Sequence, residues 1–189
     1  MHLHRRRIAP LLAGTAAAAA VLLAAPRRSR AASRAEIDAE VNAALVRLRA
    51  LPQAAPLLQR AHATLIFPRI ISGGFIVGGQ YGEGAAIQGG RIVGYYSIAG
   101  VSLGLLAGAQ AAGLAMFFMT EEAIRALMSS DGWQIGTGPS VVVLDRGVQA
   151  NLTTTTATEP VYAITFNQEG LMASLALDGT KITRINPPA

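Results

Sequence analysis

Few residues in this sequence have the types and spacing that catalysis or metal binding requires. The chain contains no cysteine, and its three histidines are His2, His4 and His62. Disulfides, thiolate metal sites and cysteine nucleophiles are therefore excluded, and His62 alone falls short of the usual multi-histidine metal site. The acidic residues Glu83 and Asp131 show no spacing typical of paired acid–base catalysts. We expect a protein that is not an enzyme and has no catalytic residues, no metal and no cofactor.

The side chains best suited to bind a ligand are arginines that lie close to apolar residues. Arg47 and Arg49 belong to a segment in which apolar residues recur every three or four positions, and Arg60 and Arg69 follow it. Arginines can bind anionic headgroups while leucines enter the apolar layer of a membrane. The predicted lipid-binding residues are Arg47, Arg49, Arg60, Arg69, Leu45 and Leu48. The alternative is that this apolar stripe packs on the rest of the domain.

The element that carries most of these residues is a helix over residues 34–50. Ser33 is followed three positions later by Glu36, which is the pattern of a capping box. Acidic residues lie near its start and arginines near its end, as the helix dipole favours, and Pro52 ends it. Pro56 predicts the start of a second short helix that runs to about His62. A third helix is expected from Thr120, its N-cap, to about Ser130.

The charge of the chain is concentrated at its beginning. The formal net charge is +5, but six arginines lie before residue 33 and the remainder has 10 basic and 11 acidic residues. A nucleic-acid-binding domain needs a basic surface in its folded part. Nucleic acid is therefore not an expected partner.

The first 32 residues have the organisation of a secretory signal peptide. A basic run, residues 2–7, precedes an apolar run, residues 8–25, and Ser29-Arg30-Ala31 offers a cleavage site between small residues. The arginine run is compatible with either the general secretory or the twin-arginine route. The alternative is a retained membrane anchor. We expect an exported protein of the periplasm or cell envelope.

The rest of the chain predicts an α+β domain with a mainly antiparallel, glycine-rich curved sheet, two N-terminal helices and one interior helix. Leu65–Pro68 predicts a strand that ends at the proline. Residues 73–90 predict short strands separated by tight turns, and residues 171–177 another strand after a hairpin turn. Gly78, Gly79, Gly82 and Gly84 are expected to be structural. The expected organisation is a signal peptide (1–32), a helical segment (33–60) and the main domain (61–186).

From about Ala61 to Ile185 a series of short motifs resembles the SYLF domain family. The motifs are Leu65-Ile66-Phe67-Pro68, Gly74-Phe75 with Gly78-Gly79, Tyr81-Gly82-Glu83-Gly84, Gly94-Tyr95-Tyr96-Ser97, Ser102-Leu103-Gly104 with Gly108-Ala109-Gln110, Phe118-Met119-Thr120, Asp131-Gly132-Trp133, Pro160-Val161-Tyr162 and Gly170-Leu171-Met172 with Gly179-Thr180-Lys181-Ile182. Members of this family are lipid-binding and actin-binding modules of endocytic proteins and of many exported bacterial proteins. The Tyr95-Tyr96 pair is similar to the bacterial branch.

The resemblance implies binding of membrane lipids with phospholipid or phosphoinositide headgroups. Actin is not an expected partner of an exported protein. The alternative function is a structural or protein-interaction domain of the cell envelope that does not bind lipid. The sequence identifies no protein partner.

Overall fold

The computed structural model describes residues 31–74, 77–103, 108–144, 158–169, 177 and 179–189. They belong to one compact unit, Ala31–Ala189. Most of the segment predicted as a signal peptide and most of the strand predicted at 171–177 lie outside the described residues.

Three helices accompany the sheet. α1 (Arg34–Ala50) begins with the predicted capping box: the Ser33 side chain accepts a hydrogen bond from the Glu36 backbone N–H, and the Ser33 N–H donates to the Glu36 carboxylate at 2.7 Å. α2 (Ala55–Arg60) begins one residue before Pro56 and ends two residues short of His62. α3 (Glu121–Ser129) is capped by the Thr120 hydroxyl, which accepts from the Ala123 N–H at 3.2 Å.

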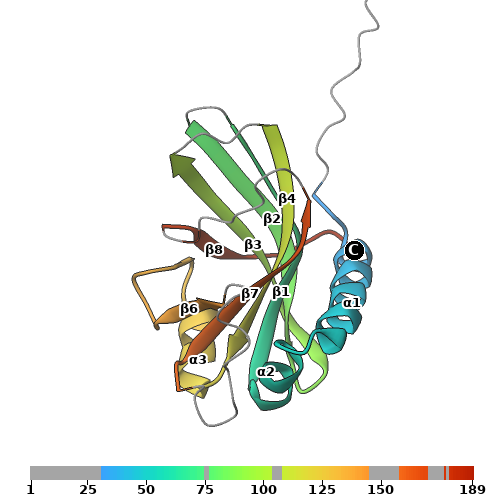
Figure 1. Cartoon of the computed structure of the whole chain (residues 1–189). Coiled ribbons are helices and arrows are strands. Elements are labelled where there is room, and N and C mark those ends of the chain that lie inside the picture. Colours follow the sequence, from blue (N-terminus) through green and yellow to red (C-terminus); the bar gives the residue numbers. More distant parts are fainter. Residues whose placement is uncertain (1–30, 75–76, 104–107, 145–157, 170–176, 178) are drawn as a thin grey trace, which may run out of the picture. The chain divides into compact units, whose positions relative to one another are not determined.

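The strands form one strongly curled sheet with the order β5-β8-β3-β2-β1-β4-β7-β6 (Figure 1). Their bounds are β1 (Ala63–Gly74), β2 (Val77–Gln88), β3 (Arg91–Leu103), β4 (Gly108–Phe118), β5 (Trp133–Gln134), β6 (Val141–Leu144), β7 (Val161–Glu169) and β8 (Lys181–Ile185). The sheet is mixed, because β6 pairs with β7 in parallel while the other pairs are antiparallel.

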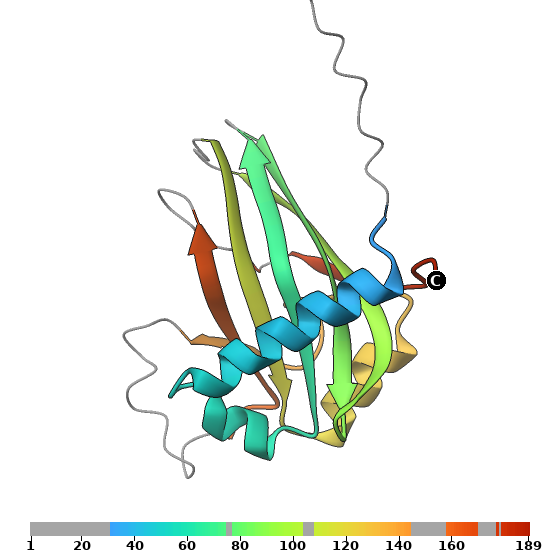
Figure 2. The same ribbon diagram turned by 90° about the vertical axis from the view of Figure 1, so that its right-hand side faces the viewer.

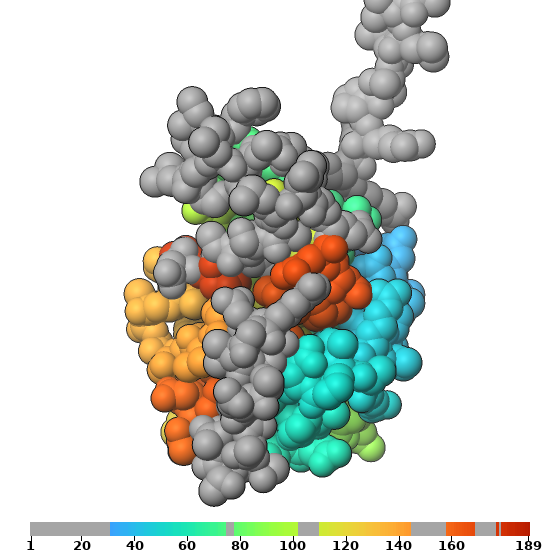
Figure 3. Space-filling view, in the orientation of Figure 1, coloured from blue at the N-terminus to red at the C-terminus, as the bar shows by residue number. Residues whose placement is uncertain are grey.

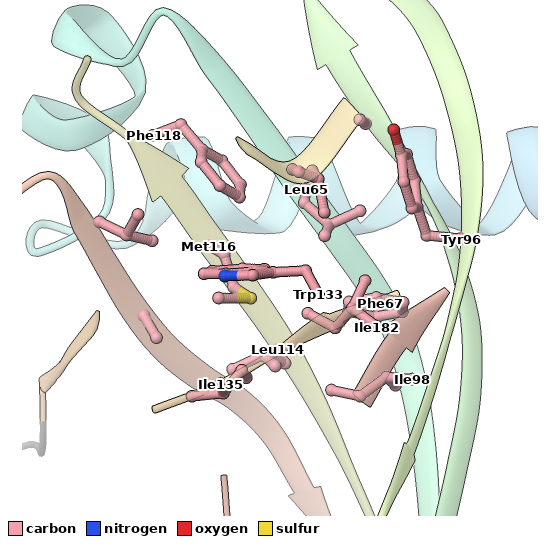
Figure 4. Packing of buried hydrophobic residues seen from close by; sticks show 14 of the residues in the cluster. Leu65, Phe67, Tyr96, Ile98, Leu114, Met116, Phe118, Trp133, Ile135 and Ile182 are labelled. Atoms are coloured by element: carbon pink, nitrogen blue, oxygen red, sulfur yellow. The ribbon is translucent and has the colours of Figure 1, made fainter. Parts of the chain in front are cut away.

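The sheet buries apolar side chains on both faces, because successive residues of a strand point to opposite sides. In β4, Leu114 and Met116 belong to the cluster on the inner face, whereas Ala115 and Phe117 belong to the cluster on the outer face. α3 packs on the inner face, where Trp133 lies near Met116 (Figure 4). α1 and α2 pack on the outer face, and α1 runs obliquely across the strands (Figure 2).

The expected end of a strand at Pro68 is wrong, because β1 continues past it. The register of β1 against both neighbours shifts around this residue, between Ile66 and Arg69 on one side and between Phe67 and Ile70 on the other. A bulge accommodates proline because it leaves one residue outside the ladder of backbone hydrogen bonds. The proline therefore bends the strand without ending it.

The glycine-rich stretch is also arranged differently from the prediction. It lies mostly within two long strands, β1 and β2, rather than in several short ones. A Cβ atom on Gly84 would overlap the carbonyl of Ile66, and one on Gly82 would lie 2.8 Å from the carbonyl oxygen of Arg69. Both glycines thus let β2 approach the bulged part of β1 closely, whereas a Cβ on Gly79 would meet nothing nearer than 3.9 Å.

Candidate functional site

The outer face of the sheet carries the candidate site, and α1 divides it. Ile37, Val41, Ala44 and Leu48 point from α1 into the sheet and are at most 2% exposed. Residues on either side of this stripe, such as Arg47 and Leu45, line two separate grooves between α1 and its neighbours. In the space-filling view α1 and α2, blue to turquoise, form one flank of the molecule (Figure 3).

The N-terminal half of α1 is held to the sheet and to the end of the chain by polar contacts. The Arg34 guanidinium donates to the carbonyl oxygen of Pro187 at 3.1 Å, and the Tyr95 hydroxyl donates to the Asp38 carboxylate at 2.9 Å. The guanidinium of Arg34 also lies 5.9 Å from the centre of the Tyr95 ring, within the range of a cation–π interaction. Arg34 is thus engaged in holding the helix in place.

A carboxylate next to the start of α1 adds to this attachment. Glu83 of β2 accepts hydrogen bonds from the Ala32 N–H at 3.1 Å and from the Tyr81 hydroxyl at 2.7 Å. Loss of solvent contact is the main cause that raises the pKa of Tyr81 to about 12, and the hydrogen bond to Glu83 and its negative charge add to it. The same kinds of cause raise the pKa of Tyr95, with burial first and Asp38 second.

The C-terminal half of α1 is different, because its polar side chains remain available. A groove of about 220 Å³, the first groove, lies between this half and the bulge of β1. Arg47 of α1 and Arg69 of β1 both line it, although they are 22 positions apart, together with Glu40 and Asn167. Among the described residues, neither guanidinium lies within ion-pair distance of a carboxylate. The first groove therefore has two unpaired cations and one anion.

Exposed apolar side chains lie next to these arginines. Val46, the neighbour of Arg47, is 65% exposed, and Ile71, two positions after Arg69 in β1, is 53% exposed. Ile71 is paired with Tyr81 of β2, which is 52% exposed. Figure 2 shows that α1 crosses only one part of β1 and β2. Cationic and apolar groups thus occur side by side on one face.

The predicted lipid-binding residues are brought together in part. Arg47 and Arg69 share the first groove, and Leu45 and Arg49 share the second groove on the other side of α1. Arg60 is an exposed residue at the end of α2 and lines neither groove, while Leu48 is fully buried against the sheet. Val46 and Ile71 were not among the predicted residues. Only the exposure of Val46 could have been inferred from the sequence, because Val46 lies on the helix face opposite the buried stripe.

The structure offers little that resembles a catalytic centre. The described residues contain no group of three or more His, Asp or Glu side chains that could hold a metal ion. Residues 100–104 match the Gly-x-Ser-x-Gly pattern of a nucleophile elbow. Such an elbow joins a strand to a helix, whereas Ser102 lies in β3 and the next element is the strand β4. The pattern is therefore not used as an elbow.

Comparison with known proteins gives one family. Residues 99–186 match the model of a family described as Ysc84, Las17-binding protein actin regulator. The match begins within β3 and extends to β8, so it excludes α1 and β1, on which Arg47, Arg49 and Arg69 lie. No curated protein matches the chain. Within the described residues, no helix is long and apolar enough to cross a membrane.

Proposed function

We propose, starting from the membership of residues 99–186 in the SYLF domain family, that this protein binds the surface of membranes rich in anionic lipid. The observation that carries the proposal is the first groove, where Arg47 and Arg69 lie without an ion-pair partner among the described residues. Lipid headgroups bearing phosphate are suitable ligands, because a guanidinium can donate two parallel hydrogen bonds to them.

The contact that we propose leaves α1 docked on the sheet. Its buried stripe, including Leu48, belongs to the outer cluster, so detaching the helix would expose that cluster to water. Val46 and Ile71 can instead enter the interfacial region of the bilayer while the two arginines remain at the headgroups. A basic residue near an anionic surface contributes about 1 kcal/mol, so we expect modest binding that weakens with salt.

We propose further that residues 1–32 direct export and that the folded part acts in the cell envelope without catalysing a reaction. The basic and apolar runs at the beginning of the chain support export. Mass spectrometry of the protein from its native cell should find a mature N-terminus near Ala31–Ser33. A soluble protein that retains Met1 would contradict export.

Flotation with vesicles tests the lipid contact. The protein should float with vesicles that contain phosphatidylglycerol and stay behind with pure phosphatidylcholine. The double variant Arg47→Gln plus Arg69→Gln should bind roughly thirtyfold more weakly, since two contributions of about 1 kcal/mol are lost. The control is Arg125→Gln, because Arg125 is an exposed arginine of α3 on the other side of the sheet and is paired with Glu122 at 3.4 Å.

Two results would refute the proposal. If the wild-type protein does not float with any anionic vesicle, the domain is better described as a structural or protein-interaction module of the envelope. If the Arg125→Gln control weakens flotation as much as the double variant does, net charge rather than the first groove determines binding.

A further inference from the structure

The second groove lies on the other side of α1 and has a volume of about 380 Å³. Its apolar lining comes from four elements, with Leu45 on α1, Leu58 on α2, Ala63 on β1 and Ile87 on β2. Leu45, Leu58 and Ile87 are only partly buried, although they pack against the outer cluster. The groove thus presents apolar surface from several elements to the solvent.

The polar groups of the second groove are basic or neutral. Arg49 and His62 line it together with Gln59 and Thr64, and none of its lining residues is acidic. Arg49 has no carboxylate within ion-pair distance in the part of the chain that the structure describes. The first groove differs, because Glu40 is present there and its apolar lining residues are three alanines and a proline. The second groove therefore combines an apolar surface with an uncompensated cation.

The volume of the groove limits what can occupy it. Small-molecule sites have volumes of about 300–1,000 Å³. An unbranched hydrocarbon chain can lie along the partly buried side chains of Leu45, Leu58 and Ile87 that line the groove. The positive charge of Arg49 favours a ligand that has an anionic group at one end.

We propose that the second groove binds a single-chain amphiphile with an anionic head, such as a fatty acid or a lysophospholipid. Its carboxylate or phosphate accepts hydrogen bonds from Arg49 and His62, and the first part of its chain covers Leu45, Leu58 and Ile87. This inference deepens the proposed lipid binding, because it gives the protein a site for one lipid molecule in addition to a contact with the membrane surface. The lipid is held between α1, α2 and the start of the sheet.

Calorimetric titration of the full-length protein with oleate, below the concentration at which oleate forms aggregates, tests the site. Oleate should bind with a stoichiometry of one, methyl oleate more weakly because it has no charge, and acetate not at all because it has no chain. Lysophosphatidylglycerol in a parallel titration distinguishes a phosphate from a carboxylate head. The amphiphile that binds more tightly shows whether the site prefers a carboxylate or a phosphate head.

Matched variants locate the site. Arg49→Gln should weaken oleate binding about tenfold, since a charge-assisted hydrogen bond is lost. Arg125→Gln removes the same charge from α3, on the other side of the sheet, and should leave oleate affinity unchanged. Leu58→Trp should abolish binding by filling the groove, and circular dichroism checks that this variant is folded. Equal effects of Arg125→Gln and Arg49→Gln, or full oleate binding by folded Leu58→Trp, would overturn the proposal.

The two proposals fail in different ways. A protein that floats with vesicles but does not bind oleate has the surface contact without the single-lipid site, and the inference is wrong. A protein that binds oleate through Arg49 but never floats has the site without the surface contact, and the proposed function is wrong.

Discussion

The inner and outer faces of the sheet are covered by different elements and to different extents. The inner face is closed by large side chains from several strands and by α3, and its Trp133 ring lies 5.8 Å from that of Phe118. Among the described residues, α1 and α2 cover the outer face where they cross it, and a groove remains on each side of α1. The inner face stabilises the fold, whereas the outer face also carries the two grooves that we propose as ligand sites.

The polar groups of the two faces also differ in their hydrogen bonding. On the inner face the Tyr96 hydroxyl and the Trp133 indole N–H have no hydrogen-bond partner among the described residues. Burial is the main cause that raises the pKa of Tyr96 there. On the outer face the hydroxyls of Tyr81 and Tyr95 each donate to a carboxylate. The difference indicates that attachment of α1 depends on directed polar contacts as well as on apolar packing.

The largest expected effect comes from a methyl group placed on the inner side of β2. Gly84→Ala should lower the free energy of unfolding by more than about 3 kcal/mol, because the new Cβ overlaps the Ile66 carbonyl and lies 2.9 Å from the Cα of Phe67. The control is Gly79→Ala, since Gly79 belongs to the same strand but has its nearest prospective contact at 3.9 Å. Urea unfolding should show a change within about 1 kcal/mol for this control. Equal stability of the two variants would contradict the close approach of β1 and β2.

A smaller effect is expected from loosening the outer face. Leu48→Ala should lower the free energy of unfolding by about 2–5 kcal/mol, because Leu48 is completely buried between α1 and the sheet. Val46→Ala, two positions away, should change it by less than about 0.5 kcal/mol, because Val46 is 65% exposed. Urea unfolding measures both variants.

The variants Leu48→Ala and Val46→Ala also test whether α1 stays docked on the sheet or detaches from it when the protein binds lipid. If α1 binds while docked, folded Leu48→Ala protein should float with anionic vesicles as well as the wild type, and Val46→Ala should float less well. If vesicle binding rises when Leu48 is truncated, α1 must leave the sheet to bind, and the docked arrangement proposed above is wrong.

Local patterns in the sequence were sufficient for the helices and for much of the sheet. Ser33 and Glu36 predicted the start of α1, and Thr120 that of α3, because capping depends on a few neighbouring residues. The curled sheet with three helices was predicted in its main features, but the parallel pairing of β6 with β7 was not. Periodicity does not determine in which direction two strands pair, because pairing depends on tertiary contacts.

The candidate site was less predictable for a physical reason. The arginines could be selected by type, but whether two of them face the same groove depends on how α1 crosses the sheet. The bulge at Pro68, which affects where Arg69 lies, was interpreted as the end of a strand. Leu48 was selected because it is apolar and near arginines, yet the same periodicity is typical of a helix that packs on a core. Periodicity alone could not distinguish these two roles.

The smallest expected effect concerns the polar attachment at the rim of the outer face. The pKa of Tyr81 is about 12 in the folded protein, above its ordinary value of about 10, so folding favours the protonated phenol. The contribution of Tyr81 to stability is therefore fully present below about pH 10 and is lost as the pH rises through about 12. Because Tyr81 is 52% exposed, solvent screens its interaction with Glu83 and the effect should be small.

Urea midpoints of the wild type and Tyr81→Phe should differ below about pH 10 and converge toward about pH 12. The pKa values of Tyr95 and Tyr96 are also raised, but both residues are present in the two proteins and their effects cancel in the difference. A difference that stays constant over this range would show that the Tyr81 hydroxyl does not stabilise the attachment through its hydrogen bond to Glu83.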